Sequence, residues 1–236
     1  MTAAVLEISG VSKDYRGLRP LRLQQLTVGA GERIAILGLD RLSAEVFINL
    51  VTGASLPDAG DIRIFGRATS AIADSAEWLA TIDRFGIVSE RAVLLDQLTV
   101  VQNLAMTFTL DIEPPSDETR QQAERLADEV GLPEAAWKKA VLELDAPGHM
   151  RVRLGRALAL NPDVLLLEHV SAGFAPAGAV AIGDDIRTIA TRRGAAIVAA
   201  TADAAFARAV AARVLTLEPA TGRLKEQSSR RWFGGF

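Results

Sequence analysis

Residues 33–51 read RIAILGLDRLSAEVFINLV, and this stretch carries the strongest structural signal in the chain. It starts with a short apolar run that stops at Gly38, which is typical of a strand buried on both faces of a sheet. Apolar residues then recur at helical spacing and predict a helix over 43–52. A strand, a glycine and a helix in this order form the scaffold of a phosphate-binding loop.

Strands and helices alternate along most of the chain, which predicts an α/β fold with a parallel, doubly wound sheet. Apolar runs at 164–167 and 195–199 predict two more buried strands. The other expected elements are the strands 5–8, 21–28, 61–65, 85–88, 214–217 and 223–225, and the helices 71–82, 116–130, 149–160, 178–192 and 203–212. A helix-rich stretch interrupts the alternation, so we expect a core lobe from 1–90 and 161–226, a helical lobe from 91–160 and a tail from 227–236.

The composition excludes several classes of protein. The 236 residues include 26 basic and 29 acidic side chains, a net charge of −3, so we expect no nucleic-acid partner. The chain has no cysteine, which excludes disulfides, thiolate metal sites and a cysteine nucleophile. No stretch reaches the roughly 18 apolar residues of a spanning helix, and we expect no signal peptide and a cytoplasmic protein.

The loop after Gly38 lacks most of the residues that bind phosphate. Such a loop needs glycines that let backbone N–H groups face one phosphate, a lysine for the outer phosphates and a Ser or Thr for magnesium. At the two inner glycine positions, the lysine position and the Ser/Thr position, this chain has Arg41, Ser43, Ala44 and Glu45. Asp40 and Glu45 also bring negative charge to a helix end that otherwise favours anions.

Several framework segments lie outside this loop: LEISGVSKDY at 6–15, LTVVQNL at 98–104 and RALALNPDVLLL at 156–167. With these segments, the chain resembles the nucleotide-binding subunit of an ATP-binding-cassette (ABC) transporter over about its full length. The resemblance implies an α/β P-loop NTPase fold of the ABC ATPase class, with a mixed core sheet, helices and a helical lobe. It also places Tyr15 where the family stacks an aromatic ring on adenine.

The positions that carry the chemistry of the family differ in this chain. Glu90 stands for the glutamine that senses magnesium, and LDAPG at 144–148 stands for the signature loop. Three more replacements are Glu168 for the magnesium-associated aspartate, His169 for the general-base glutamate and Ala202 for the switch histidine. The degenerate nucleotide site that the resemblance implies consists of Tyr15, Gly38, Arg41, Ser43, Ala44, Glu45, Glu90, Glu168, His169 and Ala202. We therefore expect no catalytic residue and no metal site, with ATP binding weak or absent and no magnesium.

Each of these positions also has a simpler interpretation. Tyr15 is either an adenine platform or a loop tyrosine on the surface. For His169 we favour a residue that only ends a buried strand over a general base. Glu45 and Glu168 could hold a cation between them, but we favour a solvated helix residue and a strand-end carboxylate.

The predicted function is that of a catalytically degenerate ABC subunit that supports or regulates a membrane transport complex at its cytoplasmic face. The resemblance implies a permease partner and a second ABC ATPase subunit. It also implies a docking region for the permease at Phe85, Gly86, Glu90, Val93 and Leu95. Two alternatives remain: an ABC subunit that hydrolyses ATP with unusual motifs, and a soluble interaction protein that reuses the fold.

Overall fold

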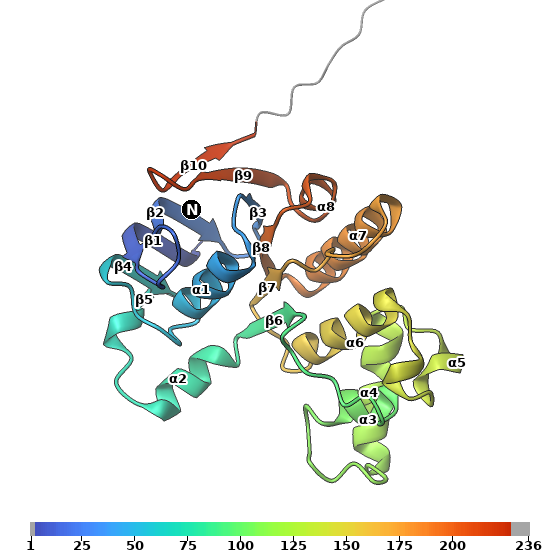
Figure 1. Ribbon diagram of the computed structural model, residues 1–236. Helices are drawn as coiled ribbons and strands as arrows, with labels where there is room; N and C mark the ends of the chain where they lie inside the picture. Colours follow the sequence, from blue (N-terminus) through green and yellow to red (C-terminus); the bar gives the residue numbers. More distant parts are fainter. Residues whose placement is uncertain (1–2, 228–236) are drawn as a thin grey trace, which may run out of the picture.

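The computed structural model describes residues 3–227, which form two β-sheets and the helices packed on them (Figure 1). The first sheet has the strand order β2-β1-β4-β5 and is antiparallel. The second has the order β10-β9-β3-β8-β7-β6 and is parallel except for β10. The strands are β1 (Ala4–Lys13), β2 (Leu21–Gly29), β3 (Arg33–Leu37), β4 (Ala59–Ile64), β5 (Arg67–Ala68), β6 (Phe85–Ser89), β7 (Val164–Glu168), β8 (Ala196–Thr201), β9 (Arg213–Glu218) and β10 (Arg223–Glu226).

The parallel sheet is therefore present, but it does not include the first strands of the chain. Strands β2 and β4 instead pair with β1 on its two sides, and both pairs are antiparallel. Helix α1 (Arg41–Val51) fills the space between the two sheets (Figure 1). Its buried Phe47 packs in one cluster with Ile34 of β3 and Ile62 of β4.

The remaining helices cover the other face of the parallel sheet or form the helical lobe, except for the helix at residues 75–82, which lies on the core lobe beside the end of α1. They are α2 (Ser75–Ile82), α3 (Val100–Ala105), α4 (Asp117–Glu129), α5 (Glu134–Trp137), α6 (Ala146–Leu158), α7 (Pro176–Arg193) and α8 (Ala204–Val210), with 3-10 turns at Thr69–Ala71 and Val141–Glu143. A single apolar cluster runs from Ala35 and Leu165 of the sheet through Leu154 of α6 to Leu126 of α4. No helix within residues 3–227 combines the length and the apolar character needed to span a membrane.

Aspartate caps set the starts of three helices and correct the expected boundaries. Helix α1 begins at Arg41 instead of 43, because the carboxylate of Asp40 accepts a hydrogen bond from the first turn. Helix α6 begins at Ala146 instead of 149, since Asp145 caps it and a proline is tolerated in the first turn of a helix. Helix α2 begins at Ser75 after the cap Asp74, and a 3-10 turn takes up residues 69–71 before it.

The turn that precedes α3 is held by the buried side chain of Asn103. Its Oδ1 accepts a hydrogen bond from the Leu95 N–H at 2.9 Å. Its Nδ2 donates to the carbonyl oxygens of Leu95 and Thr99, both at 3.0 Å. This one amide therefore shapes the turn that leads from the sheet into α3.

Replacing Asn103 should destabilise the whole protein. We expect Asn103→Ala to lower the free energy of unfolding by about 1–3 kcal/mol, because it leaves backbone groups of the turn without partners. Urea unfolding followed by circular dichroism measures this change. The matched control is Gln97→Ala at an exposed position of the same turn, which should stay within about 0.5 kcal/mol of wild type. Equal losses in the two variants would contradict the assignment.

Candidate functional site

A cavity of about 280 Å³ lies at the carboxyl ends of β6 and β7, beside the first turns of α1. Parallel strands end at the same edge of their sheet, which is why residues far apart in the sequence meet there. The cavity is lined by Arg41, Leu42, Glu45, Ser89, Glu90, Arg91, Glu168 and His169. Five of the residues expected at the nucleotide site are thus brought together: Arg41, Glu45, Glu90, Glu168 and His169.

The loop that leads from β3 into α1 is closed by its own aspartate. The carboxylate Oδ1 of Asp40 accepts hydrogen bonds from the Ser43 N–H at 2.7 Å and the Ser43 hydroxyl at 2.6 Å. These bonds hold the pKa of Asp40 below its ordinary value. The backbone carbonyl oxygen of Asp40 also accepts a hydrogen bond, from the Ala44 N–H at 2.8 Å. The N–H groups of Ser43 and Ala44 in the first turn of α1 therefore already have acceptors within the chain.

Other residues of this loop are turned away from the cavity. Ser43 and Ala44 are buried in the protein, and neither lines the cavity. Gly38 has a φ of +94°, and a Cβ at this position would lie 3.0 Å from the backbone oxygen of Leu217. Gly38 is thus required by the turn and by its contact with β9, independently of any ligand.

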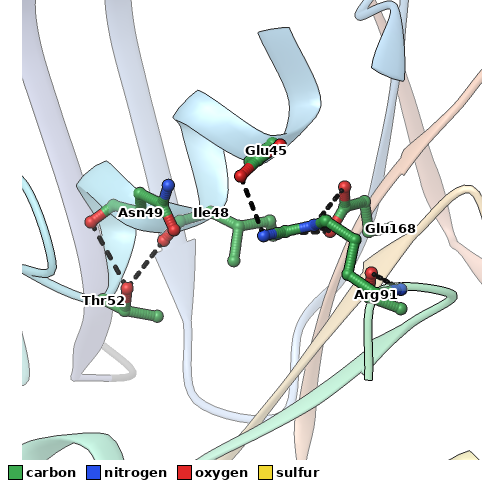
Figure 2. A network of polar contacts seen from close by, with 7 residues as sticks. Glu45, Ile48, Asn49, Thr52, Arg91 and Glu168 are labelled. Carbon is green, nitrogen blue, oxygen red and sulfur yellow. Dashed lines mark hydrogen bonds and ion pairs between the residues drawn. The ribbon is translucent and has the colours of Figure 1, made fainter. Parts of the chain in front are cut away.

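The most extensive polar contact in the cavity is made by Arg91, a residue that the sequence analysis did not single out. Its guanidinium lies between two carboxylates (Figure 2). Nε is 3.1 Å from both oxygens of Glu168, and Nη2 is 2.7 Å from Oε2. On the other side, Nη1 donates to Glu45 Oε1 at 3.1 Å. The bonds to Glu168 raise the pKa of Arg91 above its ordinary value, although burial acts in the opposite direction.

Glu45 lies on helix α1 and Glu168 ends strand β7, as the favoured interpretation has it, but the two carboxylates are also connected. They share a cation, and that cation is the Arg91 side chain. The side chain of Glu168 is only 7% exposed, so its charge has to be neutralised within the protein. The sequence does show Glu45 in the first turns of a helix, Glu168 at the end of a strand and Arg91 after β6. Their spacing along the chain, however, does not reveal that the three side chains are in contact.

Two other residues of the cavity lining, Arg41 and Glu90, form a second ion pair. Arg41 Nη1 lies 3.2 Å from Glu90 Oε2, and both side chains are largely exposed. The lining therefore has two cations, Arg41 and Arg91, against three carboxylates. This excess of negative charge opposes a bound polyphosphate.

His169 directly follows β7, as expected for a residue that ends a buried strand. It has a φ of +47°, in the left-handed region that non-glycine residues rarely adopt. Its N–H donates to the Ala200 oxygen at 2.9 Å, whereas its buried Nε2 has no hydrogen-bond partner within residues 3–227. The hydrogen bond to β8 thus explains the position of the His169 backbone, and we assign no catalytic role to its imidazole ring.

The other expected positions lie outside the cavity. At the start of α6, Asp145 accepts from the Gly148 N–H at 2.8 Å, so this helix is also capped by its own carboxylate. Ala202 follows β8, and the next residue, Asp203, caps α8 by accepting from the Phe206 N–H at 3.0 Å. Tyr15 is half-buried against the core of the first sheet, and burial, followed by the charge of Asp40, raises its pKa.

The expected docking residues divide into buried and exposed ones. Phe85 is buried in β6, and a Cβ at Gly86 would lie 2.5 Å from the Ala157 oxygen of α6. These two residues are therefore not accessible to a partner, because Phe85 packs against Phe65, with ring centroids 5.2 Å apart, and helix α6 packs directly on Gly86. Val93 and Leu95 are 73% and 40% exposed. Beside them lies a cavity of about 590 Å³, lined by Leu95, Asp96, Gln97, Leu98, Leu110, Asp111, Ile112 and Glu113.

Residues 3–227 contain no cluster of three or more His, Asp or Glu side chains arranged to hold a metal ion. Glu45 and Glu168, which were considered as holders of a cation, both bind Arg91.

Comparisons with known proteins agree with this architecture. Residues 21–170 match the family described as ABC transporter. The "Lipoprotein-releasing system ATP-binding protein LolD" of Pseudomonas syringae pv. tomato is 30% identical over 227 residues, which cover 94% of this chain and 98% of that protein. The "Methionine import ATP-binding protein MetN" of Leifsonia xyli subsp. xyli is 28% identical over 228 residues, 95% of this chain but only 65% of that protein.

A solved structure shares the fold. The structure of cbiO1 from Clostridium perfringens, described as part of the ABC transporter complex cbiONQ, superposes with a TM-score of 0.78. It covers 94% of this chain and 87% of its own length at 21% sequence identity.

The capping role of Asp40 predicts a pH-dependent loss of stability. Asp40→Ala should lower the free energy of unfolding by about 1 kcal/mol at pH 7, while Asp40→Asn should keep most of the cap. Because the pKa of Asp40 is lower in the folded than in the unfolded state, its stabilisation is fully present above the unfolded-state pKa. It is lost as the pH falls through the folded-state pKa.

Urea unfolding at pH 7 and at about pH 3 measures this effect, since an unperturbed aspartate titrates near pH 4. The difference between wild type and Asp40→Ala should narrow at the lower pH. A difference that is the same at both pH values would show that the charge of Asp40 does not cap α1.

Proposed function

The chain belongs to the ABC transporter family, and we propose that it supports or regulates a membrane transport complex without hydrolysing ATP itself. The expected fold class, an α/β P-loop NTPase of the ABC ATPase class, is confirmed by the comparison with solved cassettes. The relatives are ATP-binding subunits by name, so the family implies ATP binding. The loss of catalysis, the weak ATP binding and the partners are our proposal for this chain.

The observation that carries the proposal is the closed loop at Asp40. A phosphate at a helix N-terminus is held by free backbone N–H groups. Here the carboxylate of Asp40 takes the hydrogen bonds of Ser43, and α1 is already wound at Arg41. Bound phosphate would have to displace a negative group that is covalently part of the loop, and Ala44 cannot replace the charge of a lysine.

The second half of a composite site supports the same proposal. In the family, one subunit presents its phosphate loop and the other its signature loop. In this chain Asp145 occupies the Gly148 N–H at the start of α6. An intact ATPase partner would therefore supply a working phosphate loop. The signature segment that this chain presents to it would still have the Gly148 N–H bonded to the carboxylate of Asp145.

Magnesium also does not fit the residues that the family assigns to it. Glu45 replaces a neutral hydroxyl ligand, and both Glu45 and Glu168 are engaged by Arg91. We derive no reaction step through a metal ion or a nucleotide at this site.

The proposed partner is a permease that docks beside Val93 and Leu95. The adjoining cavity combines the apolar Leu95, Leu98 and Leu110 with the acidic Asp96 and Glu113. Such a surface favours a short segment that inserts an apolar side chain and carries basic residues at the rim. Docking of this kind would place the protein at the cytoplasmic face of the membrane, together with a second ABC ATPase subunit.

We expect the purified chain to show no ATP hydrolysis above background. Loss of one positioned charge stabiliser typically slows a reaction by about 100- to 1,000-fold, and here the residues at several such positions are replaced. A coupled assay of phosphate release measures the rate, and isothermal titration calorimetry measures ATP affinity, which we expect to be weak or absent. Turnover at a rate typical of the family would identify a working ATPase with unusual motifs and overturn the proposal.

Tyr15→Ala is the control for residual binding. Stacking of one base on an aromatic ring contributes about 1–3 kcal/mol. If ATP binds wild type at low micromolar concentration and Tyr15→Ala abolishes this binding, an adenine platform persists and the phosphate repulsion is overestimated.

Docking predicts selective effects of surface substitutions. The permease encoded nearest to this protein should co-purify with wild type, whereas Val93→Asp and Leu95→Asp should reduce its recovery at least 10-fold by burying a charge in the contact. Leu79→Asp is the matched control, because Leu79 is similarly exposed at 52% but lies on α2 of the core lobe. Equal recovery with all variants, or no permease at all, would favour the soluble interaction protein.

A further inference from the structure

We propose that the guanidinium of Arg91 is a built-in counter-ion that replaces a divalent cation between Glu45 and Glu168 and holds loop 90–95 in one conformation. Neither metal nor nucleotide is then needed to order this loop. The inference rests on the proposed function, since both keep magnesium out of the cavity. It concerns the internal order of the chain, however, and its experiments measure neither ATP turnover nor docking.

The geometry around Arg91 is that of a bridging cation. Three of its hydrogen bonds go to the buried Glu168, and a fourth, at 3.1 Å, reaches Glu45 on α1 (Figure 2). A planar guanidinium can contact two carboxylates at once through separate N–H groups, which a lysine ammonium does less well. With Arg91 in place, both carboxylates have a cationic partner within the chain, and one negative charge of the three groups remains.

Further contacts fix the backbone of the same loop. The Arg91 N–H donates to Ser89 Oγ at 3.1 Å. From α6, Arg153 Nε donates to the Ala92 oxygen at 3.1 Å and Arg156 Nη1 donates to the Val93 oxygen at 2.7 Å. The loop is therefore held by the core lobe through Arg91 and by the helical lobe through two other arginines.

Arg91 lies just before the exposed residues of the loop, so its ion pairs affect where those residues are placed. Val93 and Leu95 follow Arg91 directly and are exposed, so their placement depends on how this segment is anchored. A ligand shifts a conformation only through a difference in affinity for the two states. Since Arg91 already binds both carboxylates, we expect addition of magnesium or ATP to leave the arrangement of the exposed side chains unchanged.

The first experiment measures Mn²⁺ binding in the absence of nucleotide by electron paramagnetic resonance of the free ion. We expect no binding to wild type at millimolar Mn²⁺ and at least 10-fold tighter binding to Arg91→Ala, in which two carboxylates lack their cation. Arg91→Ala combined with Glu168→Gln should lose this gain. Equal Mn²⁺ binding by wild type and Arg91→Ala would overturn the proposal.

The second experiment measures hydrogen exchange of a peptide that covers residues 89–96. Exchange in wild type should be the same with and without Mg²⁺ and ATP. In Arg91→Ala it should rise at least 10-fold, and Mn²⁺ should partly reverse the rise. Arg84→Ala is the matched control, because Arg84 forms an exposed ion pair with Asp163, at 2.6 Å, before the other end of β6. Unchanged exchange in Arg91→Ala would overturn the proposal.

Arg91→Lys keeps the test decisive if Arg91→Ala does not fold. The lysine retains a positive charge beside Glu168 but cannot bridge both carboxylates with the same geometry. We expect faster exchange at 89–96 than in wild type and no Mn²⁺ binding, and exchange equal to wild type would contradict the bridging role. If the Mn²⁺ and exchange results hold while wild type hydrolyses ATP, only the proposed function fails. If they fail while no ATP is hydrolysed, only this inference fails.

Discussion

The buried carboxylate of Glu168 constrains the region around the candidate site. Glu168 ends β7, and its side chain is only 7% exposed, so a charge left unpaired there would strongly destabilise the fold. Arg91 neutralises it and, through Glu45, connects the loop after β6 with helix α1. One side chain therefore ties together three elements whose carboxyl or amino ends meet at the same edge of the sheet.

Helix ends near this edge follow a common pattern. Helices α1, α6 and α8 each begin with an aspartate whose carboxylate accepts backbone N–H groups of the first turn: Asp40, Asp145 and Asp203. An N-cap of this kind stabilises a helix by about 1 kcal/mol and supplies the negative charge that its dipole favours. The same groups that could bind an external anion thus stabilise the protein internally, which links its folding to the function we propose.

The sequence by itself determined the central strands, the family and the residue types at the phosphate-loop positions. Strands β3, β7 and β8 were predicted because each is a continuous apolar run, as burial on both faces requires. The helix after β3 was predicted from the spacing of its apolar residues. The replacement of the family's lysine by Ala44 can be read directly from the sequence, because it concerns a single position. Helix starts were displaced by two or three residues for α1 and α6, because a cap depends on side-chain geometry that spacing alone does not specify.

Tertiary structure alone decided how the charged residues are paired and which candidate residues are accessible. Arg91 is separated from Glu45 by 46 positions and from Glu168 by 77, so only the common edge of β6 and β7 and the start of α1 bring them together. Phe85 and Gly86 lie in a stretch that matches the family, but Phe85 is buried in the apolar cluster around the first sheet and Gly86 is buried under helix α6. Local patterns reflect the burial of a strand or helix face, whereas the pairing of distant charges depends on where those elements end in space.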